Sequence, residues 1–248
     1  MANLAVKGVF MTSTTSPTAS GSILLIGASR GLGLAMATEF LRKGWNVVGT
    51  VRGAVRTELH DLADEHPGRL EIESLDITQP DQIVTLHDRL ASRRFDMLFH
   101  NAGTANANPQ GPVGEVSTEE FIRVLVANAL GPMRVIEGLQ DLVPSEGLIG
   151  VMSSGQGSIS NNERGGAELY RGSKAALNQY MRCYAARHSE GRRALVLMAP
   201  GWIRTSLGGP NAPFSIEETI PKVVDVLLAQ QGKPGLQFLD REGQTVPW

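Results

Sequence analysis

Short apolar runs alternate with longer segments of helical period along the chain after Gly21. Several of the runs are apolar at nearly every position, which is typical of strands in a sheet that helices cover on both faces. The candidate strands are residues 22–26, 46–50, 70–74, 97–100, 148–152, 194–198 and 237–239. Strands that alternate with helices indicate βαβ units and therefore predict a parallel sheet.

Two of the candidate helices have ends that can be located in the sequence. Lys43 and Gly44 look like a basic last turn followed by a glycine cap. Residues 117–120, Ser-Thr-Glu-Glu, have the pattern of a capping box that opens the helix containing Asn128. Neither a repeat nor a linker interrupts the alternation. We therefore predict one α/β domain over residues 21–248, with a single Rossmann-type, doubly wound parallel sheet of about seven strands and helices on both faces.

Composition and charge narrow the class of protein. The 248 residues are 42% hydrophobic and 19% charged, as in a globular domain, and no stretch is long and apolar enough to span a bilayer. The net charge of -2 gives no basic field for nucleic acid or an anionic membrane surface. Cys183 is the only cysteine and cannot form an internal disulfide, which favours a reducing compartment, the cytoplasm.

Residues 1–20 differ from the rest of the sequence. Their second half is rich in Ser and Thr and cannot bury enough apolar surface to offset the entropy of ordering it. A signal peptide would need a longer apolar block. We expect these residues to form a flexible N-terminal tail.

A glycine-rich turn, Gly-Ala-Ser-Arg-Gly-Leu-Gly at residues 27–33, follows the first strand directly. Its glycines allow a tight turn and let a phosphate group approach the backbone N–H groups at the start of the next helix. An ordinary strand-to-helix loop is the alternative interpretation. The strand before the turn and the helix after it favour a dinucleotide site.

The end of the second strand indicates which dinucleotide would bind. NAD enzymes of this fold usually carry an acidic residue there for the ribose 2′-hydroxyl, whereas this chain has Val51 followed by Arg52. Arg30 in the glycine turn supplies a second guanidinium group, and two such groups suit a 2′-phosphate. We therefore predict NADP(H) over NAD(H). The alternative is that either arginine is a solvated loop cation.

Tyr170 and Lys174 are candidate reactive groups because residues four apart lie on the same face of a helix. A nearby ammonium and an oxidised nicotinamide would stabilise the phenolate, which gives the tyrosine a useful acid/base range. Ser153 and Ser154 follow an apolar strand, where a hydroxyl can hydrogen-bond a substrate oxygen. We favour Ser154 for this role, with Ser153 as the alternative. A purely structural role for Ser153 would be to cap loop backbone with its hydroxyl.

Asn128 lies in an apolar helical pattern with Phe121, Val124 and Leu125, an unusual position for an amide unless a partner satisfies it. Gly-Pro at residues 131–132 predicts a local distortion of this helix. A buried Asn that bonds only to backbone is the alternative to a functional role.

The order of these motifs resembles that of the short-chain dehydrogenases/reductases (SDRs), from residue 21 to the end of the sequence. The matching motifs are Gly27 to Gly33, His100-Asn101-Ala102-Gly103, Asn128, Ser154, Tyr170-Arg171-Gly172-Ser173-Lys174 and Pro200-Gly201. Within the family, the chain is similar to the C-factor-like branch in Arg171, residues 201–205, the loop 208–212 and the terminal Pro247-Trp248.

The resemblance implies roles for the matching residues. It makes Asn128, Ser154, Tyr170 and Lys174 the catalytic set, with Lys174 also reaching the nicotinamide ribose and Asn128 holding a water of a proton relay. The residues implied in cofactor binding are Gly27, Ser29, Arg30, Gly31, Leu32, Gly33, Arg52, Asp76, Ile77, Asn101, Ala102, Gly103, Tyr170, Lys174, Pro200, Gly201, Ile203 and Thr205.

Two of these residues have competing structural roles. Asp76 resembles the family's adenine contact, but it is also suited to a turn before the next helix, with Thr78 as the cap. Thr205 resembles the residue that binds the nicotinamide carboxamide, but it also suits the cap of a short helix.

The sequence therefore predicts an NADPH-dependent oxidoreductase that reduces a small ketone or aldehyde, or oxidises the corresponding alcohol, with Tyr170 as acid/base. The alternative is an NADP(H)-binding signalling protein that acts through a protein partner, because the C-factor-like branch includes proteins associated with signalling. The complete set of Asn, Ser, Tyr and Lys argues against that alternative.

The remaining predictions concern metals and assembly. The five histidines show no paired metal-ligand spacing, so we predict no catalytic metal. His100 is expected to pack or to hydrogen-bond at the end of its strand. Apolar residues on several sides of the helix that carries Tyr170, together with the family resemblance, predict a homodimer or homotetramer. The residues behind that prediction are Ala175, Ala176, Met181, Cys183 and Tyr184.

Overall fold

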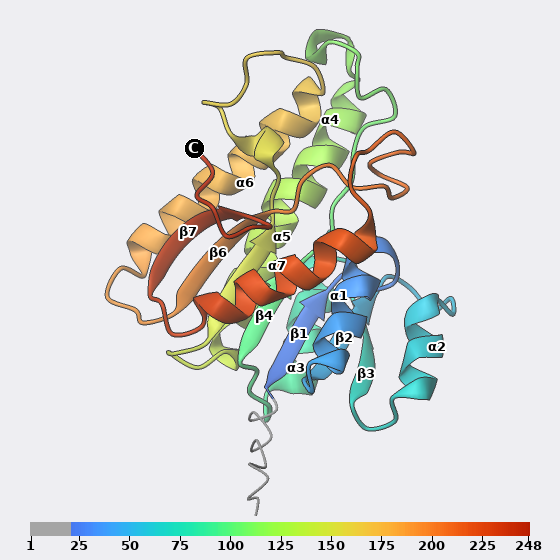
Figure 1. The fold of residues 1–248 in the computed structure, drawn as a ribbon, viewed down its shortest axis with the longest axis vertical. Coiled ribbons are helices and arrows are strands. Elements are labelled where there is room, and N and C mark those ends of the chain that lie inside the picture. The colour runs from blue at the N-terminus through green and yellow to red at the C-terminus, as the bar shows by residue number, and fades with distance from the viewer. Residues whose placement is uncertain (1–20) are drawn as a thin grey trace, which may run out of the picture.

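The computed structural model describes residues 21–248, so the flexible tail predicted for residues 1–20 lies outside the described residues. A seven-stranded parallel sheet forms the centre of the molecule, in the order β3-β2-β1-β4-β5-β6-β7 (Figure 1). The strands are β1 (Ser22–Ile26), β2 (Asn46–Val51), β3 (Leu70–Ser74), β4 (Met97–His100), β5 (Leu148–Met152), β6 (Ala194–Ala199) and β7 (Gly235–Asp240). All seven predicted strands are confirmed. β7 is longer at both ends than the sequence pattern indicated, and β2 and β6 are each one residue longer.

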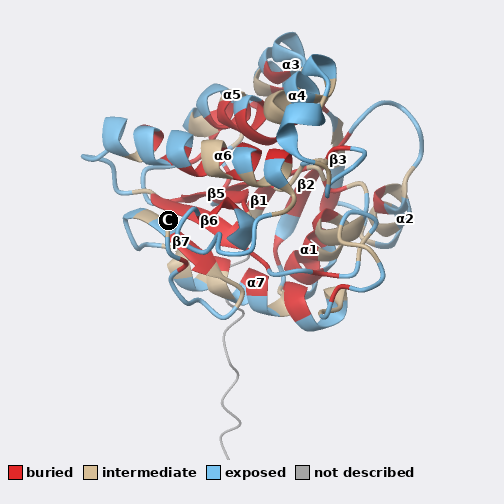
Figure 2. Ribbon diagram, turned by 90° about the horizontal axis from the view of Figure 1, so that it is seen from above, coloured by how far each residue is buried: buried red, intermediate tan, exposed pale blue. Residues whose placement is uncertain are grey.

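Helices cover both faces of the sheet, as predicted (Figure 2). On one face lie α1 (Gly31–Arg42), α2 (Glu58–Glu65) and α7 (Ile216–Gln230). On the other lie α3 (Pro80–Leu90), α5 (Gly131–Leu139) and α6 (Glu168–Arg187). α4 (Thr118–Leu125) leads into α5 through a π-helical turn, Val126–Leu130. Short 3-10 helices lie at Val113–Glu115, Gln140–Leu142 and Gly155–Gly157.

The two-sided cover explains why the strands are apolar at almost every position. Leu24 and Ile26 of β1 belong to the core beneath α3, α5 and α6, whereas Ile23 and Leu25 belong to the core beneath α1 and α7. Successive side chains of a strand point to opposite faces, so both sets must be apolar. All four are fully buried.

The two helix ends located in the sequence have different outcomes. Gly44 has a φ of +88° and its N–H donates to the carbonyl of Leu41 at 3.0 Å, which confirms the glycine cap of α1. At α4, Ser117 Oγ accepts from the Glu120 N–H at 3.2 Å, but the Glu120 carboxylate accepts from the Ala107 N–H at 2.8 Å. The predicted capping box is therefore only half formed, because the Glu120 carboxylate binds the loop residue Ala107 and not the backbone of Ser117.

Over residues 21–248, no helix combines the length and the apolar character that crossing a bilayer requires.

Candidate active site

The candidate residues meet where β1, β4 and β5 end. The glycine turn follows β1, Asn101 follows β4, and Ser153 and Ser154 follow β5. Because the strands are parallel, their carboxyl ends share one edge of the sheet, which is where ligands bind in doubly wound folds.

Close backbone contacts determine the shape of the glycine turn. Gly27 has a φ of +83°, and a Cβ at Gly33 would lie 2.0 Å from the Gly27 carbonyl oxygen. Asn101 Nδ2 donates to that same carbonyl at 2.8 Å. A Cβ at Gly31 would meet no atom within 4 Å, so space is open at the first residue of α1. The turn thus fits a phosphate group at a helix N-terminus.

Arg30 and Arg52 stand on segments that are joined by hydrogen bonds. The Ala28 N–H donates to the Thr50 carbonyl at 2.8 Å, and the Gly27 N–H donates to Thr50 Oγ1 at 2.9 Å. Both arginines are exposed, and within residues 21–248 neither side chain forms a hydrogen bond or an ion pair. They are therefore available to an anionic group beside the glycine turn.

Asp76 takes the turn role that competed with ligand binding, although Gln79 and not Thr78 is the N-cap of α3, and Thr205 closes a turn where a short helix was expected. Asp76 Oδ1 accepts from the Thr78 N–H at 2.9 Å and from Thr78 Oγ1 at 2.7 Å. Thr205 Oγ1 accepts from the Gly208 N–H at 3.0 Å. These bonds leave the adenine and carboxamide roles as predictions.

The remaining predicted cofactor residues lie on the same edge of the sheet. Ala102 packs against Gly27, since a Cβ on that glycine would lie 2.8 Å from the Ala102 Cβ. Gly201 has a φ of +98° after the end of β6, and Ile203, 4% exposed, pairs with Phe214 in an isolated bridge. Ile77 is buried, and Ser29 and Leu32 are half-buried in the glycine turn.

Tyr170, Ser154 and Lys174 are brought together by α6 and the end of β5. The Ser154 side chain lies beside the Tyr170 phenol and acts to lower its pKa. Lys174 Nζ lies 5.9 Å from the centre of the Tyr170 ring and donates to the Met152 carbonyl at 2.9 Å. The strand end thus supplies both the serine and an acceptor that orients the lysine.

The two adjacent serines have different partners. Ser153 is buried, and its Oγ donates to Asn178 Oδ1 at 2.6 Å, while Asn178 Nδ2 donates to the Gly157 carbonyl at 3.1 Å. Ser154 is half-buried, and its Oγ accepts from the Gln156 N–H at 3.1 Å and faces Tyr170. The geometry favours Ser154 as the residue that contacts a substrate oxygen.

Asn128 is fully buried on the π-helical turn, and its side chain forms three hydrogen bonds there. Its Oδ1 accepts from the Thr104 N–H at 2.8 Å, and its Nδ2 donates to the Thr104 carbonyl at 2.8 Å and to Ser173 Oγ at 3.0 Å. Pro132 has no N–H to give to the Asn128 carbonyl four residues earlier, so regular α-helical pairing stops here. The predicted helix distortion is confirmed.

The electrostatics of the reactive groups are dominated by burial. Burial raises the pKa of the Tyr170 phenol, and the hydrogen bond with Ser154 opposes that rise. Burial also lowers the pKa of Lys174 to about 8. The sequence analysis expects the ammonium together with an oxidised nicotinamide to stabilise the phenolate. Here the ammonium points to the Met152 carbonyl, and desolvation decides the direction.

His100 lies 1% exposed at the end of β4. Its Nε2 has no hydrogen-bond partner among residues 21–248, and burial together with the charge of Lys174 lowers its pKa to about 3. The imidazole ring is therefore neutral and packs at the end of the strand. Packing was one of the two roles expected for His100 from the sequence.

Sequence reasoning missed two partners of Asn128. Ser173 Oγ donates to the Tyr170 carbonyl at 2.7 Å and accepts from Asn128, so it joins the two predicted residues. Its position within the Tyr-to-Lys motif was a usable signal. Thr104 follows the Asn-Ala-Gly segment, and nothing in its sequence neighbourhood indicated that its backbone would bind the Asn128 amide.

The sheet order, the glycine turn at a helix N-terminus and the Tyr–Ser–Lys cluster define a dinucleotide-binding oxidoreductase. A family model described as enoyl-(acyl carrier protein) reductase matches residues 27–222. The chain belongs to the short-chain dehydrogenase/reductase family of oxidoreductases, of the classical type.

Individual relatives agree with this assignment. C-signal of Myxococcus xanthus is 32% identical over 62% of this chain and 92% of its own length. A structure from Burkholderia multivorans, described as a short-chain dehydrogenase/reductase with bound NADP, is 62% identical with a TM-score of 0.91 and covers 92% of this chain and 100% of its own. A carbonyl reductase from Pseudomonas aeruginosa in complex with NADP is 33% identical, with a TM-score of 0.84, and covers 93% of this chain and 100% of its own.

Proposed function

We propose that this protein is an NADPH-dependent carbonyl reductase that converts a small ketone or aldehyde to the alcohol and, in the reverse direction, oxidises the alcohol. The observation that carries the proposal is the cluster of Tyr170, Ser154 and Lys174 beside an open glycine turn at one edge of the sheet. The single cysteine of the protein, which can form no internal disulfide, favours a cytoplasmic location.

The described residues fit NADP(H). The open space at Gly31 suits the pyrophosphate, and the exposed Arg30 and Arg52 suit a 2′-phosphate, which two guanidinium groups can bind through charge-assisted hydrogen bonds. Relatives with bound NADP support the same choice. We assign the other predicted cofactor residues to the same site. They are Gly27, Ser29, Leu32, Gly33, Asp76, Ile77, Asn101, Ala102, Gly103, Pro200, Gly201, Ile203 and Thr205.

NADPH, when bound, supplies the hydride for the carbonyl carbon. Tyr170 donates its phenolic proton to the carbonyl oxygen, and the raised pKa of the phenol keeps that proton in place at neutral pH. Ser154 donates a hydrogen bond to the same oxygen and so stabilises the charge that develops on it. The Lys174 ammonium returns a proton to the tyrosine, and Asn128 would hold the water through which the lysine regains one. The same groups, used in the opposite order, serve the oxidation.

The substrate side of the site is bounded by two loops, residues 156–169 and 202–213. Three apolar residues in or beside these segments, Met198, Trp202 and Phe214, are candidates either for an apolar wall of the site or for core packing. Met198 is fully buried in the core and is not available to a substrate. Trp202 is 56% exposed, and its Nε1 donates to the Gly208 carbonyl at 2.7 Å, so its ring remains a candidate wall for an apolar substituent.

A signalling role through a protein partner is the second candidate, and the similarity to C-signal is its support. The assembled Tyr–Ser–Lys cluster favours catalysis, because a binding protein has no chemical need for a half-buried phenol beside a serine and a buried lysine.

The test is NADPH consumption by the purified protein with ketones, aldehydes and quinones, repeated with NADH. We expect turnover with NADPH in preference to NADH. Tyr170→Phe should lower kcat by about 10²–10⁴-fold, because it removes a proton donor, and should leave NADPH binding unchanged in a fluorescence titration. Tyr180→Phe, an exposed tyrosine of the same helix, is the matched control. Full activity of Tyr170→Phe would refute the assigned role.

A further inference from the structure

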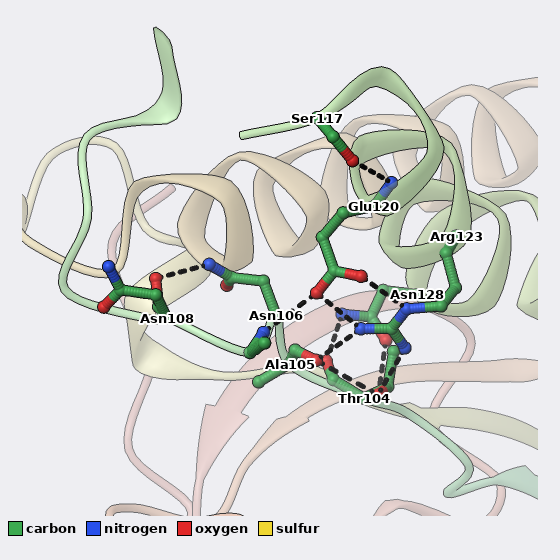
Figure 3. Close-up of polar contacts among 9 residues, drawn as sticks. Thr104, Ala105, Asn106, Asn108, Ser117, Glu120, Arg123 and Asn128 are labelled. Atoms are coloured by element: carbon green, nitrogen blue, oxygen red, sulfur yellow. Dashed lines mark hydrogen bonds and ion pairs between the residues drawn. The ribbon is translucent and has the colours of Figure 1, made fainter. Parts of the chain in front are cut away.

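A short loop segment, residues 104–107, follows the Asn-Ala-Gly segment at the end of β4 and is held by side chains of one neighbouring helix (Figure 3). Arg123 of α4 donates through Nη2 to the Ala105 carbonyl at 2.8 Å and through Nη1 to Thr104 Oγ1 at 3.1 Å. Glu120 accepts from the Ala107 N–H at 2.8 Å. Three loop residues are thus bonded by a single pair of charged side chains.

Glu120 and Arg123 also bind each other. Arg123 Nε donates to Glu120 Oε2 at 2.8 Å, and Arg123 Nη2 donates to Glu120 Oε1 at 2.9 Å. The guanidinium fork therefore serves a carboxylate and two loop oxygens at once, which a lysine ammonium on a flexible stem would not reproduce. The arginine lowers the pKa of Glu120 to about 2, so the pair stays charged at any ordinary assay pH.

The same loop is bonded to Asn128 on the π-helical turn. Thr104 is held through both its N–H and its carbonyl by the Asn128 amide, at 2.8 Å each. In a regular α-helix each residue advances about 100°, so Asn128 would be rotated about 80° from Glu120 and about 140° from Arg123. A wider turn advances less per residue and brings the amide back toward the face that meets the loop.

The contacts continue from the loop to the proposed proton donor. Asn128 Nδ2 donates to Ser173 Oγ at 3.0 Å, and Ser173 Oγ donates to the Tyr170 carbonyl at 2.7 Å. At the other end of the loop Asn106 is buried and its Nδ2 donates to the Asn108 carbonyl at 2.7 Å, while its Oδ1 has no partner among residues 21–248. A shift of residues 104–107 would therefore displace the Asn128 amide and, through Ser173, the backbone that carries Tyr170.

We propose that Glu120 and Arg123 are positioning residues, which hold residues 104–107 against α4 so that Asn128 and Tyr170 keep the geometry needed for proton transfer. The inference rests on the proposed function for its kinetic part only. Neither side chain need touch the substrate. Glu120 is diverted from its capping role to the loop, and this diversion is the observation that separates the pair from an ordinary helix-surface ion pair.

The structural part is tested by amide hydrogen exchange of the peptide covering residues 103–109 in the full-length protein. Arg123→Met should raise exchange there by at least about tenfold, because loop oxygens lose the donors that fix them. Glu120→Gln should act on the same peptide, with a smaller effect, because its amide oxygen can still accept from Ala107. Arg93→Met is the matched control, since it breaks an exposed two-bond pair with Glu71 away from the site.

The positioning part is tested by steady-state kinetics with a carbonyl substrate found in the screen. Arg123→Met should lower kcat about tenfold, with the KM for substrate and the Kd for NADPH within about twofold of the wild type, since only the alignment of the proton donor changes. Arg123→Lys should not restore kcat if the fork geometry is required. Arg93→Met should match the wild type in every measurement.

Amide exchange and kcat together distinguish a hold on the loop from a role in positioning Tyr170. Faster exchange at residues 103–109 with lower kcat supports the proposal. Faster exchange with wild-type kcat overturns the positioning role, and unchanged exchange overturns the hold on the loop itself. A wild type without NADPH-dependent turnover overturns the proposed function and its kinetic extension, while the exchange result still decides whether the pair holds the loop. Loss of cooperative unfolding in Arg123→Met, with Arg93→Met still cooperative, would assign the kinetic loss to misfolding and overturn the positioning role.

Discussion

Ser153 and Ser154 are adjacent in the chain, yet their hydroxyl groups have opposite surroundings. Ser153 donates to the buried amide of Asn178, whereas Ser154 faces Tyr170. Sequence alone favoured Ser154 and kept Ser153 as the alternative, because both follow the same strand. The partner of Ser153, Asn178, lies 25 residues further along the chain and supports the same preference.

Substituting the two serines separates chemistry from stability. Ser154→Ala should lower kcat about 100-fold with little effect on the melting temperature, because a hydrogen bond to the reacting oxygen is lost. Ser153→Ala should lower the free energy of unfolding by about 1–2 kcal/mol, since the Asn178 oxygen loses a buried donor, and should keep most of the activity. The measurements are kcat and urea unfolding. Reversed effects would exchange the two assignments.

Lys174 is 3% exposed, so its charge is costly to the fold. Burial lowers its pKa from 10.5 to about 8, so the folded state holds the ammonium less favourably than the unfolded chain does. The cost is complete below pH 8, diminishes as the pH rises through the folded pKa, and disappears near the unfolded pKa of 10.5.

Lys174→Met should therefore stabilise the protein at pH 7 while abolishing turnover. We expect a gain in the free energy of unfolding of about 1–3 kcal/mol, reduced by the loss of the hydrogen bond to the Met152 carbonyl. The gain should shrink between pH 8 and pH 10, as measured by urea unfolding at each pH. A Lys174→Met protein less stable than the wild type at pH 7 would contradict this account.

At the scale of elements, the strands were the most predictable part of the fold. Each is an apolar run bounded by polar or glycine-rich segments, and burial on both faces leaves this pattern in the local sequence. The glycine turn and the pair Tyr170 and Lys174 were predictable for the same reason, since their spacing is local. The distortion before Pro132 also had a local cause, the missing N–H of the proline.

The contacts that could not be predicted are those between distant segments. Glu120 has the sequence pattern of a capping box, and only the folded chain brings the Ala107 N–H to its carboxylate. The same holds for the Met152 carbonyl that orients Lys174. Helix periodicity also misplaced Phe121, which was expected on the apolar face with Val124 but is 44% exposed.

At the scale of the whole molecule, the residues that support an oligomer in the structure differ from those named from the sequence. Met181 and Tyr184, two of the residues behind that prediction, are buried in the chain's own core, and Cys183 is exposed. Exposed apolar side chains lie instead on the neighbouring helices α4 and α6, with Phe121 44%, Ile122 53% and Tyr180 46% exposed. The homodimer or homotetramer stays a prediction that now rests on these residues.

Light scattering across a dilution series tests the oligomer. We expect a dimer or tetramer at micromolar concentration, and Ile122→Glu should shift it toward monomer, because a charge in the apolar contact would be desolvated. Val84→Glu on α3, where the valine is 60% exposed, is the matched control and should leave the assembly unchanged. A fully active wild-type monomer at that concentration would contradict the prediction.

The sheet order also has a consequence for how the chain acquires its structure during synthesis. β1 lies between β2 and β4, and Ile23 pairs with Met97, so one edge of the earliest strand stays open until residues 97–100 have emerged. Parallel pairing through long crossovers is slow to form, because loop closure precedes the contacts that offset its entropy. Over that interval the open edge of β1 exposes a largely apolar strand, so the first half of the protein is the part that can pair wrongly with another chain.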